Sequence, residues 1–420
     1  MRNDFLLNWQ TAKLADVLTV KGGKRLPKGV GFSKEYTGFP YIRIVDLLDR
    51  SVRTTGLKYL DAETKGRLGQ YTIGKDDIYL SIAGTIGIAG TLPEELDGAN
   101  LTENAARLII KDKDCIFKDF VALFLTSEDG QAQIRNLTTK TTQPKLALTR
   151  IEQIQIPVPP LQQQRAISRA LGAVQEAKAA QQREIALERE RKAALMEYLF
   201  THGACNEPTK QTEIGEMPEG WQVRQLGDLC SITTGTTPAT KNKSYYQGSI
   251  PFIRTAEIKN QRIKDATTYI SEQAVIDYNL KLYPPKTVFL AMYGQGKTRG
   301  QAGILDISAA TTQNTAAFII NAELDPEYLW HWLISQYKKL RGAGAQGHIS
   351  HLNLGYVKSY KIPIPPLAEQ AAIISVLRAC DRKINASEGE VELLNELFIV
   401  MLEELMTGKV SAQPLVEVTS

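Results

Sequence analysis

The segment Ile156-Pro157-Val158-Pro159-Pro160-Leu161-Gln162-Gln163-Gln164 returns 206 residues later as Ile362-Pro363-Ile364-Pro365-Pro366-Leu367-Ala368-Glu369-Gln370. Proline lacks an amide donor and pushes the residue before it into extended geometry, so neither segment is helical before its leucine. In both copies a proline-free stretch of about 40 residues follows, which suits one continuous helix. The paired segments therefore predict two long helices that begin at equivalent places in a duplicated chain.

The residues upstream of the two segments are duplicated as well. A shift of 212 residues aligns Trp9 with Trp221 and Gly23 with Gly235. At shifts of 211 and then 210, the matched pairs are Pro40–Arg43 with Pro251–Arg254, Tyr59 with Tyr269, Leu80 with Leu290, Gly84 with Gly294 and Asn104 with Asn314. A period above 200 residues is too long for a solenoid repeat, so the repeating unit is a whole domain followed by a helix.

The first 150 or so residues of each unit mix short β-rich runs, such as Ile78–Ile82 and Thr287–Leu290, with Gly/Thr/Pro turns and a few helices. This mixture is typical of an α+β domain, and a chain of 420 residues exceeds what one core usually serves. The predicted organisation is a globular domain over residues 1–155, a helical spacer over 156–205, a second globular domain over 206–361 and a second helical spacer over 362–420.

Apolar residues recur within the two predicted helices at spacings of four and three, the pattern of a coiled-coil seam. The seam residues are Ile167, Leu171, Val174, Ile185, Leu195 and Leu199 in the first helix, and Ile373, Leu377, Cys380, Ile384, Val391, Leu394, Phe398, Met401 and Leu405 in the second. Lys178, Glu188 and Lys192 interrupt the first seam, which predicts some polar contacts in the packing.

Connectivity predicts that the helices run antiparallel, because a compact domain that connects them usually keeps its termini close together. At a rise of 1.5 Å per residue, 40 residues would set the two domains about 60 Å apart. The alternative is two separate amphipathic helices, each lying on its own domain.

Composition restricts the class of protein only broadly. The residues are 43% apolar and 23% charged, with a net charge of +4 that permits contact with phosphates without requiring it. The four cysteines, Cys115, Cys205, Cys230 and Cys380, form no CxxC pair, which predicts neither a disulfide framework nor a zinc site. We expect a cytoplasmic protein, because neither a signal peptide nor an apolar run near 18 residues is found.

This ordered duplication resembles the specificity subunits of type I restriction-modification systems. The residues that carry the resemblance are the two Pro-x-Pro-Pro-Leu-x-x-Gln segments, Pro157–Gln164 and Pro363–Gln370, together with the openings Trp9–Gly23 and Trp221–Pro238. It implies that each globular domain is a target-recognition domain that reads one half of a bipartite site in double-stranded DNA. It further implies that the helices set the spacing and dock two methyltransferase subunits, and that restriction and translocation subunits join through the complex.

The resemblance also implies a chain that has no cofactor and no catalytic residues. An adenine methyltransferase needs an aromatic residue after its Pro-Pro pair, but Leu161, Lys286 and Leu367 follow the pairs here. The stretch Ala291–Thr298 looks like a phosphate loop, yet the matching Ser81–Ile88 has no lysine, so a turn after a strand is favoured.

Two further patterns are assigned to structure rather than to chemistry. Asp61-Ala-Glu-Thr-Lys65 is similar to a nuclease Glu-x-Lys, but the repeat has Ser271 where Asp61 stands, so both are predicted to be helix N-caps. The four histidines, His202, His331, His348 and His351, lack metal-site spacing.

Side chains that read DNA are expected on loops and are basic or amide-bearing, since these groups pair with phosphates and with major-groove base edges. The candidates are Lys21, Lys24, Arg25, Arg43, Lys140 and Gln143 in the first copy, and Lys241, Lys243, Arg254, Lys297, Arg299, Arg341, Gln346 and His348 in the second.

Three roles are expected among these candidates. Residues 21–25 and the lysines 241 and 243 suit phosphate anchoring, with ordinary solvated lysines as the alternative. Arg43 and Arg254 suit either a DNA contact or a structural ion pair. The remaining candidates lie where the two copies differ, as loops that read two different half-sites would, although drifted surface loops explain the difference equally well.

Two other functions stay open at this level. A bivalent protein scaffold would use the same domains to bind proteins, and an enzyme would turn over a nucleotide or transfer a methyl group without partners. Strong dependence of binding on salt would separate the DNA-binding hypothesis from the scaffold.

Overall fold

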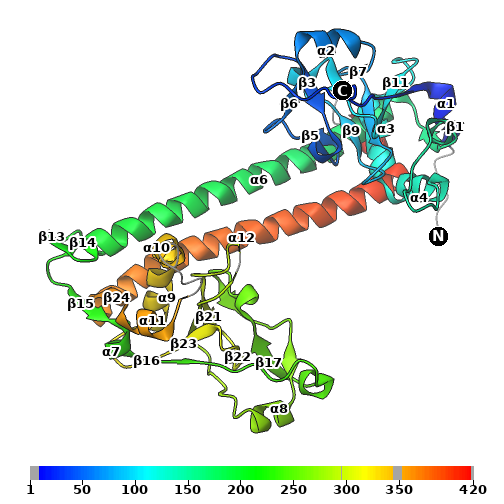
Figure 1. Cartoon of the computed structure of the whole chain (residues 1–420). Coiled ribbons are helices and arrows are strands. Elements are labelled where there is room, and N and C mark those ends of the chain that lie inside the picture. The colour runs from blue at the N-terminus through cyan, green and yellow to red at the C-terminus, as the bar shows by residue number, and fades with distance from the viewer. Residues whose placement is uncertain (1–8, 295, 344–351, 418–420) are drawn as a thin grey trace. The chain divides into compact units, whose positions relative to one another are not determined.

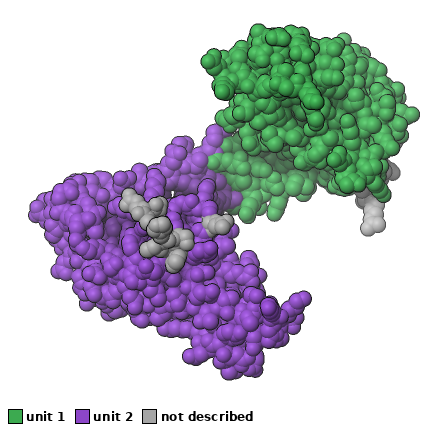
Figure 2. Space-filling view, viewed as in Figure 1, with its two compact units in different colours: residues 1–182, 389–420 green, residues 183–388 purple. Residues whose placement is uncertain are grey.

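The computed structural model describes residues 9–294, 296–343 and 352–417 of the chain. They form two compact units, residues 1–182 with 389–420 and residues 183–388 (Figure 2). The boundary between the units falls inside both long helices, α6 (Leu161–His202) and α12 (Leu367–Met406). Each unit therefore contains an α+β domain and a part of each helix.

The domain of unit 1 is built from short elements (Figure 1). They are β1 (Gln10–Lys13), α1 (Leu14–Val17), β2 (Leu18–Gly22), β3 (Pro40–Ile42), η1 (Ile44–Asp46), β4 (Leu47–Leu48), β5 (Ser51–Val52), β6 (Lys58–Tyr59), α2 (Ala62–Arg67), β7 (Thr72–Ile73), β8 (Ile78–Ser81), β9 (Ala89–Thr91), η2 (Glu94–Leu96), β10 (Ala99–Leu101), β11 (Ala105–Ile110), α3 (Lys118–Thr126), α4 (Glu128–Leu137), α5 (Leu148–Ile151) and β12 (Gln155–Val158). Two four-stranded sheets, β6-β3-β10-β7 and β2-β11-β8-β9, share the domain with the pairs β1-β12 and β4-β5.

The domain of unit 2 repeats this order after a hairpin, β13 (Thr209–Thr212) and β14 (Gly215–Pro218). Its elements are β15 (Gln222–Gln225), α7 (Leu226–Leu229), β16 (Cys230–Thr234), η3 (Lys243–Tyr246), β17 (Ile250–Ile253), η4 (Thr255–Glu257), β18 (Arg262–Ile263), β19 (Tyr269–Ile270), α8 (Glu272–Asp277), β20 (Val288–Ala291), β21 (Ala302–Leu305), β22 (Ala310–Thr311), β23 (Thr315–Ile320), α9 (Pro326–Ser335), α10 (Tyr337–Gly342), α11 (Leu354–Ser359) and β24 (Lys361–Ile364). The sheets are β16-β23-β20-β21-β18 and β19-β17-β22, with β15-β24 as a separate pair.

Strand register confirms the duplication residue by residue. In unit 1 Gln10 pairs with Val158, and in unit 2 Gln222 pairs with Ile364. The first strand of this pair is thus repeated at a shift of 212 residues and the second at a shift of 206, as the sequence predicts. Gly22 opposite Ala106 likewise matches Thr234 opposite Ala316. The same hydrogen-bonded ladders therefore form in both copies, because the alternation of inward and outward side chains fixes the register of each strand.

Both long helices begin where the proline segments predict, at Leu161 and Leu367. In unit 1 the start of α6 packs against the end of α12, since Ile167 and Leu171 share one core with Phe398, Leu402 and Leu405. Residue numbers that rise along one helix and fall along the other mean that the packed segments are antiparallel. The alternative of two helices that lie separately on their own domains is wrong.

Unit 2 shows the same packing at the other ends of the helices. Leu199 and Phe200 of α6 share a core with Ile373 and Leu377 of α12. The polar residues that interrupt the first seam are paired: Lys178 Nζ donates to Asn395 Oδ1 within unit 1 at 2.6 Å. Within unit 2, Glu188 accepts from Lys383 Nζ at 2.7 Å and Lys192 Nζ donates to Asp381 Oδ1 at 2.5 Å. The predicted polar contacts are confirmed.

A buried glutamine fixes the start of each long helix. Gln164 Nε2 donates to the carbonyls of Cys115 and Pro159, while its Oε1 accepts from the amide of Phe117 at 2.9 Å. Gln164 and its counterpart Gln370 are both fully buried. We name this arrangement the glutamine lock, because it ties the proline segment to the loop before α3.

The second glutamine lock repeats the first bond for bond. Gln370 Nε2 donates to the carbonyls of Glu323 and Pro365, and its Oε1 accepts from the amide of Asp325 at 2.8 Å. The last residue of the repeated motif thus satisfies backbone groups that would otherwise be buried without partners, which costs about 1–3 kcal/mol for each such group.

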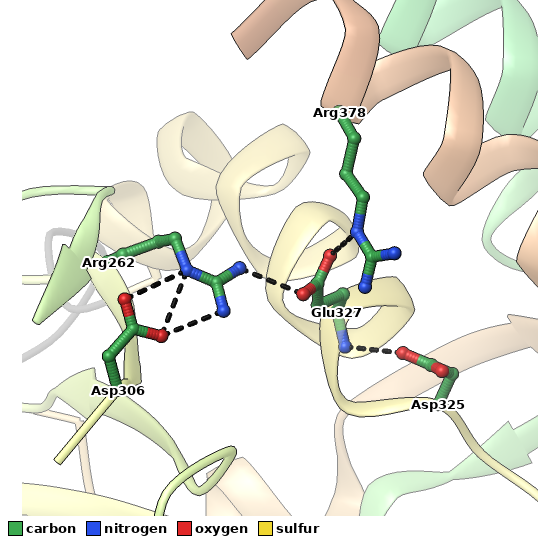
Figure 3. A network of polar contacts seen from close by, with 5 residues as sticks. All are labelled: Arg262, Asp306, Asp325, Glu327 and Arg378. Atoms are coloured by element: carbon green, nitrogen blue, oxygen red, sulfur yellow. Dashed lines mark hydrogen bonds and ion pairs between the residues drawn. The ribbon is translucent and has the colours of Figure 1, made fainter. Parts of the chain in front are cut away.

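In unit 2 a charged network also ties the domain to α12 (Figure 3). Glu327 of α9 accepts from Arg262 Nη1 at 2.8 Å and from Arg378 Nε of α12 at 2.5 Å, and Arg262 also binds Asp306 at 2.8 Å. Burial alone raises the pKa of Glu327, but the hydrogen bonds from Arg378 and Arg262 outweigh it and lower the pKa from 4.5 to about 2.

The predicted helix caps are confirmed. Asp61 Oδ1 accepts from the amide of Thr64 at 2.7 Å at the start of α2, and Ser271 Oγ accepts from the amide of Ala274 at 3.3 Å at the start of α8. Within the part of the chain that the structure describes, no helix is long and apolar enough to cross a bilayer.

Candidate nucleic-acid interface

The loop after β2 packs directly on the turn between β10 and β11. A Cβ atom on Gly23 would lie 2.1 Å from the carbonyl oxygen of Thr102, so only glycine fits there. The equivalent Gly235, after β16, would place a Cβ atom 1.8 Å from the carbonyl oxygen of Thr311. A Cβ atom on Gly23 would also lie 2.4 Å from the carbonyl oxygen of Leu101, the counterpart of Thr311. Close backbone contact in both copies explains why this glycine is duplicated.

The same turn supports the loop that follows β8. The carbonyl of Asn104 accepts from the amide of Ile82 at 2.8 Å, and in unit 2 the carbonyl of Asn314 accepts from the amide of Met292 at 2.9 Å. A third loop then joins: Leu146 donates its amide to the carbonyl of Ile82, and Leu352 donates to that of Met292, both at 2.9 Å.

Parallel pairing adds the ends of β3 and β17 to this cluster. Ile42 lies opposite Leu101 and Ile253 lies opposite Thr311, so the arginine after each strand stands beside the turn. We name the assembled surface the loop edge. It comprises residues 23–25, 43, 82–88, 102–104 and 139–146 in unit 1, and residues 235–237, 254, 292–294, 296–301, 312–314 and 341–343 in unit 2.

The structure brings several predicted residues of the first copy together on the loop edge. Lys24, Arg25, Lys140 and Gln143 are all exposed there. Lys140 and Gln143 lie in a loop closed by the amide of Thr139, which donates to the carbonyl of Lys145 at 3.1 Å. Lys21 is exposed on the last part of β2, next to this surface.

In the second copy Lys297, Arg299 and Arg341 meet on the loop edge. Tyr337 Oη donates to the carbonyl of Lys297 at 2.8 Å and accepts from Arg341 Nη1 at 3.1 Å, while Arg299 Nη2 donates to the carbonyl of Arg341 at 2.6 Å. Lys297 is the exposed member of the three. Gln346 and His348 lie outside the described residues.

The strand register shows that the loop between β20 and β21 is longer than its counterpart between β8 and β9. Leu80 lies opposite Ala89, whereas Leu290 lies opposite Ala302, so the shift grows from 210 to 213 across the loop. The second copy therefore carries three extra residues between its strands. The sequence, continued at a shift of 210, predicts that Lys297 replaces Gly87 and that Arg299 replaces Ala89. This alignment is wrong, because Ala89 is already in β9.

Arg43 and Arg254 occupy equivalent positions with different partners. Arg43 binds the buried Asp46 through Nε and Nη2, both at 2.8 Å. The backbone amides of both arginines donate to the acidic residue three positions on, at 2.9 Å to Asp46 Oδ2 and at 3.2 Å to Glu257 Oε1, but the Arg254 side chain is exposed. The first arginine is held in a structural ion pair, and the second offers its side chain to solvent.

Lys241 lies further along the loop after β16, and Lys243 is the first residue of η3. Both are exposed, and the neighbouring contacts of this loop run to the end of α8, where Tyr278 Oη accepts from the amide of Ala239 at 3.0 Å.

Two equivalent residues of the loop edge, Glu103 in unit 1 and Gln313 in unit 2, were not among the candidates predicted from the sequence. Glu103 Oε1 accepts from Arg25 Nε at 2.6 Å, and Gln313 Oε1 accepts from Thr237 Oγ1 at 2.5 Å. Burial raises the pKa of Glu103, but hydrogen bonds from Arg25 and Thr102 outweigh it and the pKa falls below its usual value. The adjoining Asn104 and Asn314, which do align, were the available signal.

The described residues contain no group of three His, Cys, Asp or Glu side chains placed to hold a metal ion. His331 is fully buried beside Trp330, and burial lowers its pKa to about 3, so the imidazole is neutral at physiological pH. The loop edge offers instead cationic and amide donors on exposed loops, which are the groups that contact phosphates and base edges.

Two copies of one α+β domain, each with a loop edge on the same elements and a glutamine lock on a long helix, define a tandem-repeat binding protein. Residues 7–189 and 218–396 match the family model described as "Type I restriction modification DNA specificity domain". The chain belongs to this family: it is a DNA specificity subunit of a type I restriction-modification system, with two target-recognition domains and no catalytic activity of its own.

Some relatives and solved structures match nearly the full length of this chain, and others match about half of it. The putative type I restriction enzyme MjaX specificity subunit of Methanocaldococcus jannaschii is 24% identical over 417 residues, which cover 96% of this chain and 94% of the relative. The HindI specificity subunit of Haemophilus influenzae is 28% identical over 203 residues, 46% of this chain and 42% of the relative. The solved S subunit from M. genitalium covers 97% of both chains at 15% identity with a TM-score of 0.56, which shows the fold.

Proposed function

We propose that the two target-recognition domains, residues 1–155 and 206–361, each read one half of a bipartite site in duplex DNA through the loop edge. The observation that carries this proposal is that both copies build the loop edge from the ends of equivalent strands and place different side chains on it. A shared strand framework suits a shared mode of docking on the duplex, and different loop side chains suit different base sequences.

Within each loop edge, we expect some side chains to contact phosphates and others to contact base edges. Lys24 and Lys140 in the first copy and Lys297 in the second carry point charges that suit phosphate oxygens, and the proposal extends this role to Lys21, Lys241 and Lys243. Gln143 and Arg254 carry side chains with the geometry to contact base edges. The lysines then position each domain, and the other side chains discriminate between sequences.

We further propose that the helical spacers, residues 156–205 and 362–420, fix the distance between the half-sites and dock two methyltransferase subunits. A helix of 42 residues such as α6 is about 60 Å long at 1.5 Å per residue. On α12, Leu393, Leu397 and Val400 follow at spacings of four and three and are 66%, 47% and 59% exposed. Such an exposed apolar stripe suits a partner protein. Restriction and translocation subunits then join through the methyltransferase.

The recognition proposal is tested by exchanging residues 206–361 for the same domain of a relative with a different target. Sequencing that detects methylated bases in the host is expected to show one half of the modified motif changed and the other half retained. Binding of the complete complex is expected to fall steeply between about 50 and 200 mM salt. A motif that stays the same, or that changes in both halves, would refute independent reading by the two domains.

The docking proposal has its own test. Leu393→Asp combined with Leu397→Asp is expected to abolish co-purification of the methyltransferase subunits, because it puts two charges into an apolar contact. The matched control is Ile276→Asp, an equally exposed apolar residue on α8 at 71% exposure, which should leave assembly unchanged. Normal assembly of the double variant would place the docking surface elsewhere.

A further inference from the structure

One position on the loop edge holds an ion pair in unit 1 and a neutral pair in unit 2. Arg25 lies two residues after Gly23, as Thr237 lies two residues after Gly235, and Glu103 precedes Asn104 as Gln313 precedes Asn314. The carbonyls of Asn104 and Asn314 accept from the equivalent amides of Ile82 and Met292, and a Cβ atom on either glycine would meet the carbonyl oxygens at the end of β10 or β22. The two pairs therefore occupy equivalent places, although the amide of Gly23 donates to Ala105 and that of Gly235 to Thr312. The chain has kept the scaffold here and changed the chemistry of both partners together.

The geometry of the first pair leaves the outer face of the guanidinium available. Glu103 Oε1 accepts from Nε of Arg25, and Glu103 Oε2 accepts from Thr102 Oγ1 at 3.0 Å. The carboxylate is therefore held from two sides and is 27% exposed, whereas the Arg25 side chain is 77% exposed. Among the described residues, Glu103 is the one hydrogen-bond partner of this guanidinium, and both terminal nitrogens remain open.

A carboxylate beside the guanidinium also decides between two classes of DNA contact. A phosphate oxygen that approaches Arg25 meets the negative charge of Glu103, which repels it. A guanine edge is neutral and presents two acceptors, O6 and N7, which match the two terminal nitrogens of a guanidinium whose plane is fixed. The ion pair thus favours a base contact over a phosphate contact.

We propose that Arg25, oriented by Glu103, reads a guanine in the half-site of the first domain, and that Gln313, oriented by Thr237, reads an adenine in the half-site of the second. This inference rests on the proposed function. Thr237 Oγ1 uses one lone pair of the Gln313 carbonyl, so the amide retains a donor and an acceptor, the pair that adenine N7 and N6 require. Arg25 then specifies sequence, beyond the phosphate anchoring expected for residues 21–25.

The test uses the complete type I complex with variant specificity chains and a library of sites randomised at every position of the motif. Arg25→Lys keeps the positive charge but removes the bidentate hydrogen bond to guanine O6 and N7. We expect preference for guanine at one position of the first half-site to fall about tenfold, while other positions keep their preferences. Glu103→Gln should weaken the same preference by a few-fold, because the guanidinium loses its orienting charge.

The transplant Thr237→Arg with Gln313→Glu is the matched gain-of-function variant. It is expected to shift one position of the second half-site from adenine towards guanine and to leave the first half-site unchanged. Folding is not at risk in Arg25→Lys, since the side chain is mostly exposed, and equal melting temperatures would document this for every variant.

Two results would overturn the inference. One is a uniform loss of methylation across all library sites in Arg25→Lys or Arg25→Ala, which would make Arg25 a phosphate contact. The other is an unchanged preference at every position. In both cases the exchange of residues 206–361 reports separately on the proposed function: if that exchange still alters one half of the motif, only the roles of Arg25 and Gln313 fall.

Discussion

Unit 1 and unit 2 fasten the same domain to the long helices by different means. Both have a glutamine lock, with equal bonds to a proline-segment carbonyl and to the loop before α3 or α9. In unit 2 Glu327 adds the charged network to Arg262 and Arg378. In unit 1 the matching Asp119 accepts from Thr91 Oγ1 at 3.3 Å, and Gly172 stands where Arg378 would be. There Arg50 instead lies 3.9 Å from the ring centre of Phe398.

The comparison teaches which residues a duplicated domain must keep. Bonds that satisfy buried backbone groups are the same in both copies, because an unpaired buried amide costs more than most side-chain contacts return. Contacts near the surface differ, since water can replace them at little cost. The loop edge follows the same rule: its glycines and the backbone bonds made by Asn104 and Asn314 are shared, and its exposed side chains are not.

The largest effect is expected from the glutamine locks. Gln164→Leu and Gln370→Leu should each lower the free energy of unfolding of their own unit by about 3 kcal/mol, because one buried amide and two carbonyls lose their partner. Urea unfolding monitored by hydrogen exchange in each unit would measure this. Gln162→Leu, an exposed neighbour in the same helix, serves as control. Tolerance of either buried substitution would mean that the locks do not stabilise the helix starts.

A smaller effect, confined to one unit, is expected from the charged network. Glu327→Gln should destabilise unit 2 by about 2 kcal/mol, less than for a fully buried pair because Arg262 and Arg378 are partly exposed. Asp119→Asn, the matched change in unit 1, should cost less than about 0.5 kcal/mol. Equal losses of unfolding free energy in the two units would contradict the inferred difference between them.

The two equivalent arginines should separate stability from binding. Arg43→Ala is expected to destabilise unit 1 by about 1.5 kcal/mol, since the buried Asp46 carboxylate loses two charged hydrogen bonds. Arg254→Ala should leave thermal unfolding unchanged and weaken DNA binding by the complete complex. Melting curves and a salt-matched binding titration would measure both, and a destabilised Arg254→Ala variant would contradict the difference in partners.

The smallest effect concerns acid. The pKa of Glu327 is lower in the folded protein, about 2, than its usual 4.5, so its stabilisation is complete above pH 4.5 and is lost as the pH falls towards 2. Between pH 6 and pH 3 the stability difference between the wild type and Glu327→Gln should therefore shrink by about 1 kcal/mol after screening by solvent. Unfolding titrations at both pH values would measure it. A constant difference would show that the carboxylate charge is not what stabilises the network.

Much of the fold was predictable from the sequence because repetition acts as an internal control. Proline chemistry set the helix starts at Leu161 and Leu367, and the repeat turned a possible nuclease motif at Asp61 into a helix cap. For the loop edge, the sequence predicted individual residues but not that they lie together on one surface. Nothing in residue spacing reveals that the loops at residues 82–88, 102–104 and 139–146 meet, since their meeting depends on strand pairings over long sequence distances.

The sequence by itself determined the duplication, the α+β class, the two long helices and the membership of a DNA-specificity family, because local propensity and periodic burial act on neighbouring residues. Only the tertiary structure decided that Arg43 is held by Asp46 while Arg254 is exposed, that three residues lengthen the loop before β21, and that Arg25 meets Glu103. These outcomes depend on distances between residues far apart in the chain, which packing sets and spacing does not.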